Sequence, residues 1–170
     1  FNFYFGFILS FLGLFGVNSS KSESQFFKIE NILKFSKVSE IKLKPLRKIE
    51  YDSNFSEFNT LIKNKKDSSD KYFFVTNNGR WTGFVDENIL KTVSLKKWER
   101  NFVGDFKKPI DSFESVSYND KLWRTIERLE ETNEGFLLVL NAADIPLGII
   151  DRSKIGNFVL NKLGFNLPLD

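Results

Sequence analysis

The side chains of this sequence that could do chemistry are carboxylates, amines and hydroxyls, because the chain contains no His, no Cys and no Met. Without His and Cys, neither a Ser-His-Asp nor a Cys-His catalytic site can be built, and disulfides and sulfur-ligated zinc are excluded. The sequence has no phosphate-binding motif of the G-x-G-x-x-G or G-x-x-x-x-G-K-[ST] type. Carboxylates alone could hold a metal ion, but no spacing indicates such a site. We therefore expect no catalytic and no metal-binding residues in this chain.

The charge of the chain is unevenly distributed. Its 25 basic and 22 acidic residues give a net charge of +3, too small to imply binding of nucleic acid. Between residues 21 and 48 eight basic residues stand against three acidic ones, whereas between 111 and 134 seven acidic residues stand against three basic ones. The positive excess therefore lies next to the N-terminal segment.

That N-terminal segment, residues 1–17, is apolar and carries no charge: FNFYFGFILSFLGLFGV. As a helix it would be about 26 Å long, slightly short of a ~30 Å hydrocarbon core. We interpret it as the end of a transmembrane helix. Two alternatives are a signal peptide, although the basic region and cleavage site of one are not evident, and a buried helix of a soluble domain.

The lysines that follow predict the orientation of this helix. By the positive-inside rule their side of the membrane is cytoplasmic, and they could also touch anionic lipid headgroups. The lack of Met predicts that Phe1 is an internal position of a longer polypeptide. Residues 18–36 are expected to form a juxtamembrane linker, Ser-rich up to Gln25, and then a short helix with apolar residues at helical spacing.

The rest of the chain contains an internal repeat. Three segments recur in the same order at an offset of 65 to 67 residues: 38–41 and 103–106, 51–55 and 118–122, and 83–86 and 148–151. Three matches in register indicate two copies of a unit of about 60 residues.

Each copy is expected to fold as helix, strand, turn, strand and helix. These elements are 55–62, 72–75, 77–80, 81–85 and 87–92 in the first copy, and 122–129, 136–140, 141–144, 146–150 and 153–163 in the second. Gly83 and Gly148 in the second strands predict a close approach of another backbone segment. One copy cannot bury the apolar face of its sheet, so we expect an α+β pseudo-dimer in which the two copies pack together.

The two strand–turn–strand–helix runs, FFVTNNGRWTGFVDENIL from Phe73 to Leu90 and LLVLNAADIPLGIIDRSKI from Leu137 to Ile155, resemble those of cystathionine-β-synthase-type (CBS) repeats. The resemblance implies an α+β CBS-domain pair preceded by the end of a transmembrane helix. It places repeat 1 with its linker at 37–98, repeat 2 at 99–165 and a tail at 166–170, and it implies that the chain could form a homodimer through its repeats.

The wider arrangement resembles the C-terminal region of cyanobacterial-type site-2 proteases, which are intramembrane zinc metalloproteases. The similarity lies in the linker TVSLKKW, residues 92–98, and in Gly13-Leu14-Phe15 at the end of the apolar run. It implies a regulatory, non-catalytic fragment in the membrane with its repeats on the cytoplasmic side. The zinc and the H-E-x-x-H motif would belong to the missing upstream part of the parent protease. The alternatives are the cytosolic CBS region of a transporter or channel, and a non-catalytic interaction module.

The CBS resemblance also implies a cleft for an adenosine nucleotide. The family places Ser or Thr three residues after the second-strand Gly, for phosphate, and Asp six residues after it, for the ribose. This chain has Asp86 and Asp151 at the first place, and Ile89 and Lys154 at the second. Asn88 could replace the ribose ligand and Lys154 could pair with phosphate. The candidate cleft residues are therefore Asp86, Asn88, Asp151 and Lys154, although a carboxylate at the phosphate place repels an anion.

Overall fold

The computed structural model describes residues 6, 19–64 and 71–165. The chain divides into two compact units. The terminal unit consists of Phe1–Pro45 and Glu114–Asp170, and the central unit is Leu46–Phe113. Each unit contains one three-stranded sheet with helices, so both have the expected α+β architecture.

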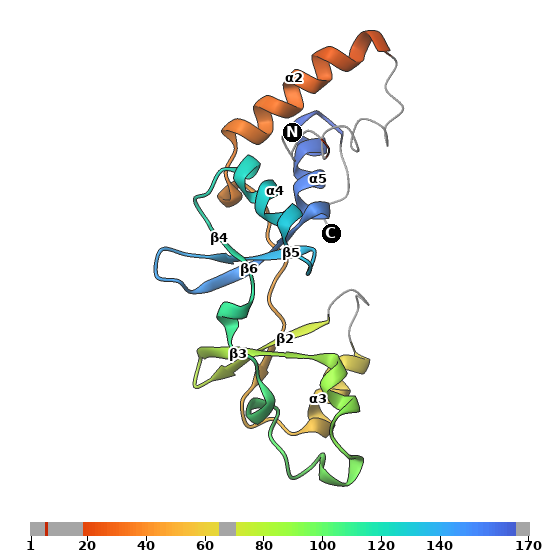
Figure 1. Ribbon diagram of the computed structural model, residues 1–170, viewed down its shortest axis with the longest axis vertical. Coiled ribbons are helices and arrows are strands. Elements are labelled where there is room, and N and C mark those ends of the chain that lie inside the picture. Colours follow the sequence, from red (N-terminus) through yellow and green to blue (C-terminus); the bar gives the residue numbers. More distant parts are fainter. Residues whose placement is uncertain (1–5, 7–18, 65–70, 166–170) are drawn as a thin grey trace. The chain divides into compact units, whose positions relative to one another are not determined.

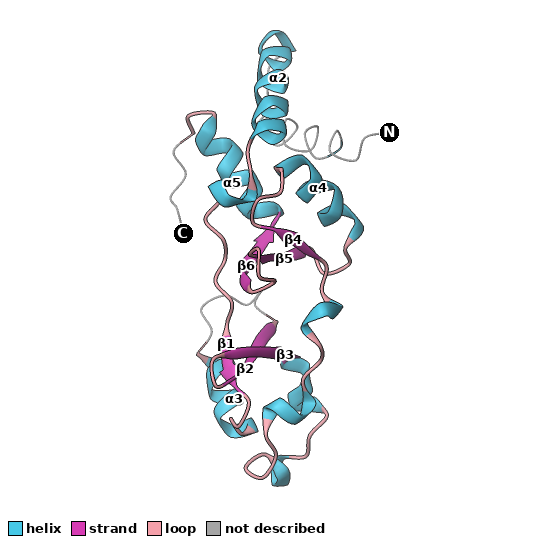
Figure 2. Ribbon diagram, turned by 90° about the vertical axis from the view of Figure 1, so that its left-hand side faces the viewer, coloured by secondary structure: helices cyan, strands magenta, loops and turns pink. Residues whose placement is uncertain are grey.

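The terminal unit has its sheet in the order β4-β5-β6. Strand β4 is parallel to β5, and β5 is antiparallel to β6. Helices α4 and α5 lie over one face of this sheet, and α2 packs against both helices (Figures 1 and 2). The elements are α2 (Ser19–Phe35), the 3-10 turn η1 (Val38–Glu40), β4 (Ser115–Ser117), α4 (Leu122–Glu131), β5 (Phe136–Leu140), β6 (Pro146–Asp151) and α5 (Arg152–Lys162).

The central unit repeats this sheet, with order β1-β2-β3 and the same parallel and antiparallel pairings. Helix α3 contributes Phe55 and Phe58 to its core, and Phe58 meets Phe73 of β2 edge-on with the ring centroids 4.9 Å apart. The elements are β1 (Lys48–Glu50), α3 (Phe55–Lys63), β2 (Tyr72–Asn77), β3 (Arg80–Asp86) and the 3-10 turns η2 (Glu87–Lys91), η3 (Leu95–Lys97), η4 (Val103–Phe106) and η5 (Ile110–Ser112).

Within the two repeats, the expected hairpins are confirmed and so are the expected helices except one, while two short strands are added. Strands β1 and β4 were not expected, because three residues are too few to show a period, and their partners are distant in sequence. The expected second helix of the first copy is the short 3-10 turn η2. Its five residues are followed by the β-branched pair Thr92 and Val93, which have low helix propensity.

The repeat in the sequence corresponds to equivalent positions in the two units. The amide of Tyr51 donates to the carbonyl of Thr76, and the amide of Tyr118 donates to the carbonyl of Leu140, in both cases over 2.8 Å. Two matched pairs of apolar residues are equally buried, since Val38, Val103, Phe55 and Leu122 are each 0% exposed. The matches therefore reflect a shared fold of the two copies.

The segments that open the two sequence repeats pack in the unit of the other copy. Lys44, from the opening of the first copy, pairs with Ile149 on β6, with both backbone hydrogen bonds 2.9 Å long. Lys108, from the opening of the second copy, pairs with Phe84 on β3 over 3.0 and 2.8 Å. A Cβ atom on Gly148 would lie 2.8 Å from the Lys44 carbonyl oxygen, and one on Gly83 would overlap the Lys108 carbonyl oxygen. The close approach predicted at both glycines is confirmed.

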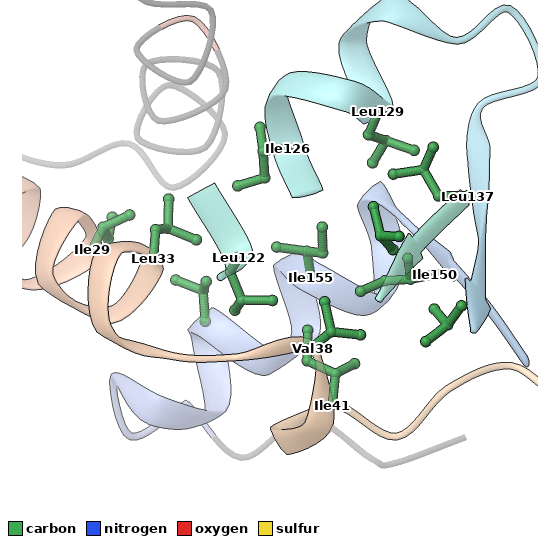
Figure 3. Close-up of a cluster of buried hydrophobic side chains, with 13 residues drawn as sticks. Ile29, Leu33, Val38, Ile41, Leu122, Ile126, Leu129, Leu137, Ile150 and Ile155 are labelled. Carbon is green, nitrogen blue, oxygen red and sulfur yellow. The ribbon is translucent and has the colours of Figure 1, made fainter. Parts of the chain in front are cut away.

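Helix α2 is longer than the sequence predicts. It is continuous from Ser19, across the stretch expected to be a linker, because Ser, Lys, Glu and Gln are all tolerated in a helix that is fixed further along by packing. Its Ile29 and Leu33 enter the terminal core, where they meet side chains of α4, α5 and the sheet (Figure 3). The helix is therefore part of the terminal unit.

The predicted transmembrane segment, residues 1–17, lies outside the described residues apart from Gly6. In the described ranges, the structure has no helix of sufficient length and apolar character for a membrane span.

Candidate functional site

Asp151 and Lys154 lie where strand β6 ends and helix α5 begins. Asp151 is the N-cap of α5, and its Oδ1 accepts a hydrogen bond from the Lys154 amide over 2.8 Å. A carboxylate in this position satisfies a backbone donor of the first turn and complements the positive end of the helix dipole. A phosphate at the same helix terminus would face this negative charge, so the structure gives Asp151 a structural role.

Asp86 and Asn88 form a local network in the central unit. The Oδ1 atom of Asp86 accepts from the backbone amide of Asn88 over 2.7 Å and from its side-chain amide over 2.8 Å. The Oδ1 atom of Asn88 accepts from the Nζ of Lys91 over 2.8 Å. Both side chains thus hold the η2 turn together. The structure places this pair in a different compact unit from Asp151 and Lys154.

A groove of about 350 Å³ lies between η1 and α5 in the terminal unit. Its lining combines three ammonium groups, one carboxylate and two amides with an apolar part formed by Ile41 and Phe158. Of the four residues proposed from sequence, only Lys154 lines it. The residues that line the groove are Glu40, Ile41, Lys42, Lys154, Asn157, Phe158, Asn161 and Lys162.

Glu40 is tied into the wall of this groove. Its Oε1 accepts from the Lys37 amide over 2.9 Å, and its Oε2 accepts from the Nζ of Lys162 over 3.3 Å. The hydrogen bond from the Lys37 amide, followed by that from Lys162, lowers the pKa of Glu40 below its ordinary value. The same Lys162 ammonium lies 5.3 Å from the ring centroid of Phe158. An anionic ligand in the groove would compete with Glu40 for Lys162 and would find two further lysines.

Of the groove residues on α5, sequence reasoning proposed Lys154 and missed Asn157, Phe158, Asn161 and Lys162. The sequence does show that these residues share one side of a helix, because Lys154, Asn157, Phe158 and Asn161 follow helical spacing. The sequence could not show that Glu40 and Lys42 complete the groove, since they lie more than a hundred residues away from α5 in the sequence.

A second groove, of about 430 Å³, lies between α2 and the end of α5. Lys162 lines both grooves, so one side chain connects the η1–α5 groove with the surface of α2. The residues of the second groove are Gln25, Lys28, Asn31, Ile32, Lys162, Leu163 and Phe165.

Two of the three tryptophans, Trp81 and Trp98, make contacts within the central unit. Trp81 meets Phe74 edge-on across the β2–β3 pair at 6.3 Å, with the Lys48 ammonium 5.1 Å from its ring centroid. Trp98 is half-buried, and its Nε1 donates to the Val93 carbonyl over 2.9 Å, which fixes the linker between the two sequence repeats. Trp123 is half-buried on α4.

In the described ranges, no three or more carboxylates gather as they would around a metal ion. No sequence profile of a known protein family matches the chain, and no curated protein matches it.

Several solved structures share the fold of this chain. The CBS domain of a bacterial CNNM/CorC family Mg²⁺ transporter is similar with a TM-score of 0.62 at 14% identity, covering 98% of this chain and 97% of that one. The CBS domain of a bacterial CNNM/CorC family Mg²⁺ transporter in complex with ATP has a TM-score of 0.61 at 14% identity, covering 81% of this chain and 96% of that one. CBSX2 in complex with AMP gives 0.55 at 21% identity, covering 75% and 98%. At these identities the likeness establishes the fold, and the chain is a mixed α+β protein with the CBS-pair fold.

Proposed function

We propose that this chain is the regulatory CBS-pair region of a larger membrane protein and that α2 transmits its state to the membrane part. The observation that carries the proposal is the packing of Ile29 and Leu33 of α2 into the core shared with α4 and α5. A helix that follows an uncharged apolar run is thereby fixed to the unit that holds the η1–α5 groove. Movement of α5 changes the surface on which α2 rests.

The ligand class that fits the η1–α5 groove is a nucleotide with an adenine base. Its volume of about 350 Å³ suits a small organic anion, and its lysines, amides and Phe158 ring offer partners for phosphate, hydroxyl and base. Two solved structures of the same fold carry AMP and ATP. In this chain the phosphate partners would be Lys42, Lys154 and Lys162, because Asp151 occupies the helix terminus.

The parent that we favour is a transporter. The likeness to the CBS domain of the Mg²⁺ transporter extends over 98% of this chain, whereas the likeness to CBSX2 covers 75%. The greater coverage supports a shared arrangement that includes the segment before the CBS pair. In this reading the chain is membrane-attached, with the pair on the cytoplasmic side and a homodimer formed through the repeats.

The second candidate parent is an intramembrane zinc metalloprotease of the site-2 type. The observation that favours it is the hydrogen bond between Trp98 and the Val93 carbonyl in the linker, because the linker of that family carries a Val and a Trp. The zinc would be held by upstream residues. The gene sequence preceding Phe1 separates the two parents. H-E-x-x-H in an upstream transmembrane helix supports the protease, and several upstream spans without that motif refute the protease and favour the transporter.

Calorimetric titration of the full chain with AMP, ADP and ATP tests the nucleotide assignment. We expect saturable binding that Lys154→Glu weakens by about tenfold or more, since it reverses a charge in the groove. Lys63→Glu, at the exposed end of α3, is the matched control and should bind like the unsubstituted chain. Absence of binding at millimolar nucleotide refutes the assignment.

Hydrogen exchange with and without the bound nucleotide tests the role of α2. Slower exchange of the α2 amides in the complex is expected, because binding stabilises the core that holds Ile29 and Leu33. Unchanged exchange in α2 beside slowed exchange in α5 would contradict transmission through this helix.

A further inference from the structure

The outer face of α2 carries exposed aromatic residues. Phe27 is 62% and Phe35 is 66% exposed, whereas Ile29 and Leu33 on the inner face are 2% and 1% exposed. The Phe27 ring meets Phe26 edge-on with the ring centroids 6.2 Å apart, yet most of Phe27 and of Phe35 stays exposed. Two such phenylalanines on one face of a helix indicate a surface that an apolar environment covers.

The helical period places these residues in a regular pattern. At about 100° per residue, Phe27, Asn31 and Phe35 form one stripe along the helix, directly opposite Ile29 and Leu33. Lys28 lies on one side of this stripe and Lys34 on the other. Lys28 and Asn31 lie at the edge of this face and also line the groove between α2 and the end of α5. All the residues of this outer face that have described side chains are exposed: Ser24, Phe27, Lys28, Asn31, Lys34 and Phe35.

The charge of the outer face is positive. Glu30, the one carboxylate among the described side chains of α2, is half-buried toward the flank and lies outside this face. Lys37, directly after the helix, is exposed and adds a further positive charge. An apolar stripe flanked by lysines is the pattern of helices that lie in the interface of an anionic bilayer, where the rings enter the headgroup boundary and the ammonium groups reach the phosphates.

We propose that the outer face of α2 lies on an anionic membrane surface, with Phe27 and Phe35 inserted at the interface and Lys28 and Lys34 against lipid phosphates. This inference rests on the proposed membrane attachment of the chain. The uncharged residues 1–17 end immediately before α2, so a chain anchored through them has this helix at the bilayer surface. The occupant is thus a lipid surface, to which the terminal unit is docked.

The test uses a polarity-sensitive dye attached to a single introduced thiol. The dye labels that position alone, because the chain has no Cys. Asn31→Cys places the dye in the stripe at the edge of the α2–α5 groove, so its emission is compared with that of the same labelled chain without vesicles. Glu131→Cys at the exposed end of α4 is the control position. The full chain is reconstituted into phosphatidylcholine vesicles with and without phosphatidylglycerol. We expect the dye at position 31 to shift to the blue and to be shielded from an aqueous quencher, more strongly with phosphatidylglycerol and less at high salt. The dye at position 131 should not respond.

Side-chain variants give the second readout. Replacing both Phe27 and Phe35 by Ser should abolish the shift at position 31, while Leu95→Ser, an equally drastic change at a 74% exposed position of the central unit, should leave it unchanged. Since all three side chains are exposed, the fold should survive, which far-UV circular dichroism checks.

The outcomes separate this inference from the proposed function. If alkaline carbonate does not extract the chain from the vesicles but the dye at position 31 stays in water, the surface contact is refuted and the membrane anchor stands. If carbonate extracts the chain, the anchor itself is refuted. A blue shift that appears without vesicles and grows with protein concentration shows that a second copy covers the face, and this also refutes the inference.

Discussion

Gly148→Ala tests whether the opening segment of the first sequence repeat is held against strand β6. In the structure the backbone of Lys44 pairs with that of Ile149 through two hydrogen bonds of 2.9 Å. A methyl group on residue 148 would lie 2.8 Å from the Lys44 carbonyl oxygen and 2.9 Å from the Leu43 Cβ, where ordinary contact begins at 3.4 Å. The segment would have to move by about half an ångström, and the atoms nearest to the methyl are backbone or Cβ atoms that cannot rotate away.

The expected cost has two parts. Overpacking at a close contact costs about 1–3 kcal/mol. Weakening two backbone hydrogen bonds adds a part of their net worth of about 0.5–1.5 kcal/mol each. We therefore expect Gly148→Ala to lower the free energy of unfolding by about 2–4 kcal/mol, and the Tm by roughly 5–15 °C for a chain of this size. Gly83→Ala should cost at least as much, because its methyl would overlap the Lys108 carbonyl oxygen.

Urea unfolding followed by far-UV circular dichroism and tryptophan fluorescence measures the effect. The emission of Trp123 reports on the terminal unit, and that of Trp81 and Trp98 on the central unit. Gly135→Asn is the control, because that glycine has a φ of +74° that Asn tolerates and no atom within 4 Å of an added Cβ. If Gly148→Ala unfolds within about 0.5 kcal/mol of this control, the opening segment is not packed as described.

Three further predictions concern the terminal unit. Leu33→Ala should lower the free energy of unfolding by about 2–5 kcal/mol in urea, and Phe27→Ala by less than about 0.5 kcal/mol, because only the first side chain is in the core; equal effects would contradict the packing of α2. Asp151→Ala should cost about 0.5–2 kcal/mol in thermal melts through loss of the N-cap of α5, and Asp151→Asn should restore most of it. The lowered pKa of Glu40 contributes stability that is present above its ordinary value of 4.5 and is lost as the pH falls through the lowered value. In thermal melts over a pH series, Glu40→Gln and Lys162→Ala should both reduce the loss of Tm on acidification. An unchanged loss would show that the Glu40–Lys162 pair contributes nothing to stability.

The sequence alone determined the local elements and their duplication. Helices α3 and α4 show helical spacing of apolar residues, and β2, β3, β5 and β6 are short apolar runs separated by turn residues, so each is specified by neighbours in the chain. The duplication was visible because equivalent sites need the same residue types, such as the fully buried Val38 and Val103. The two glycines in the second strands likewise predicted a close backbone neighbour without identifying it.

Only the tertiary structure decided which segment that neighbour is. The opening segments pack in the unit of the other copy, a choice that depends on backbone pairing between residues far apart in sequence and leaves no periodic signal. The η1–α5 groove likewise arises from two distant segments that meet in space. The sequence instead predicted a cleft at the ends of the second strands, where the candidate residues are close together in the chain. Asp86 and Asp151 illustrate the difference: their positions in the repeat were read correctly from the sequence, but their hydrogen bonds to the turns that follow are a property of the folded chain.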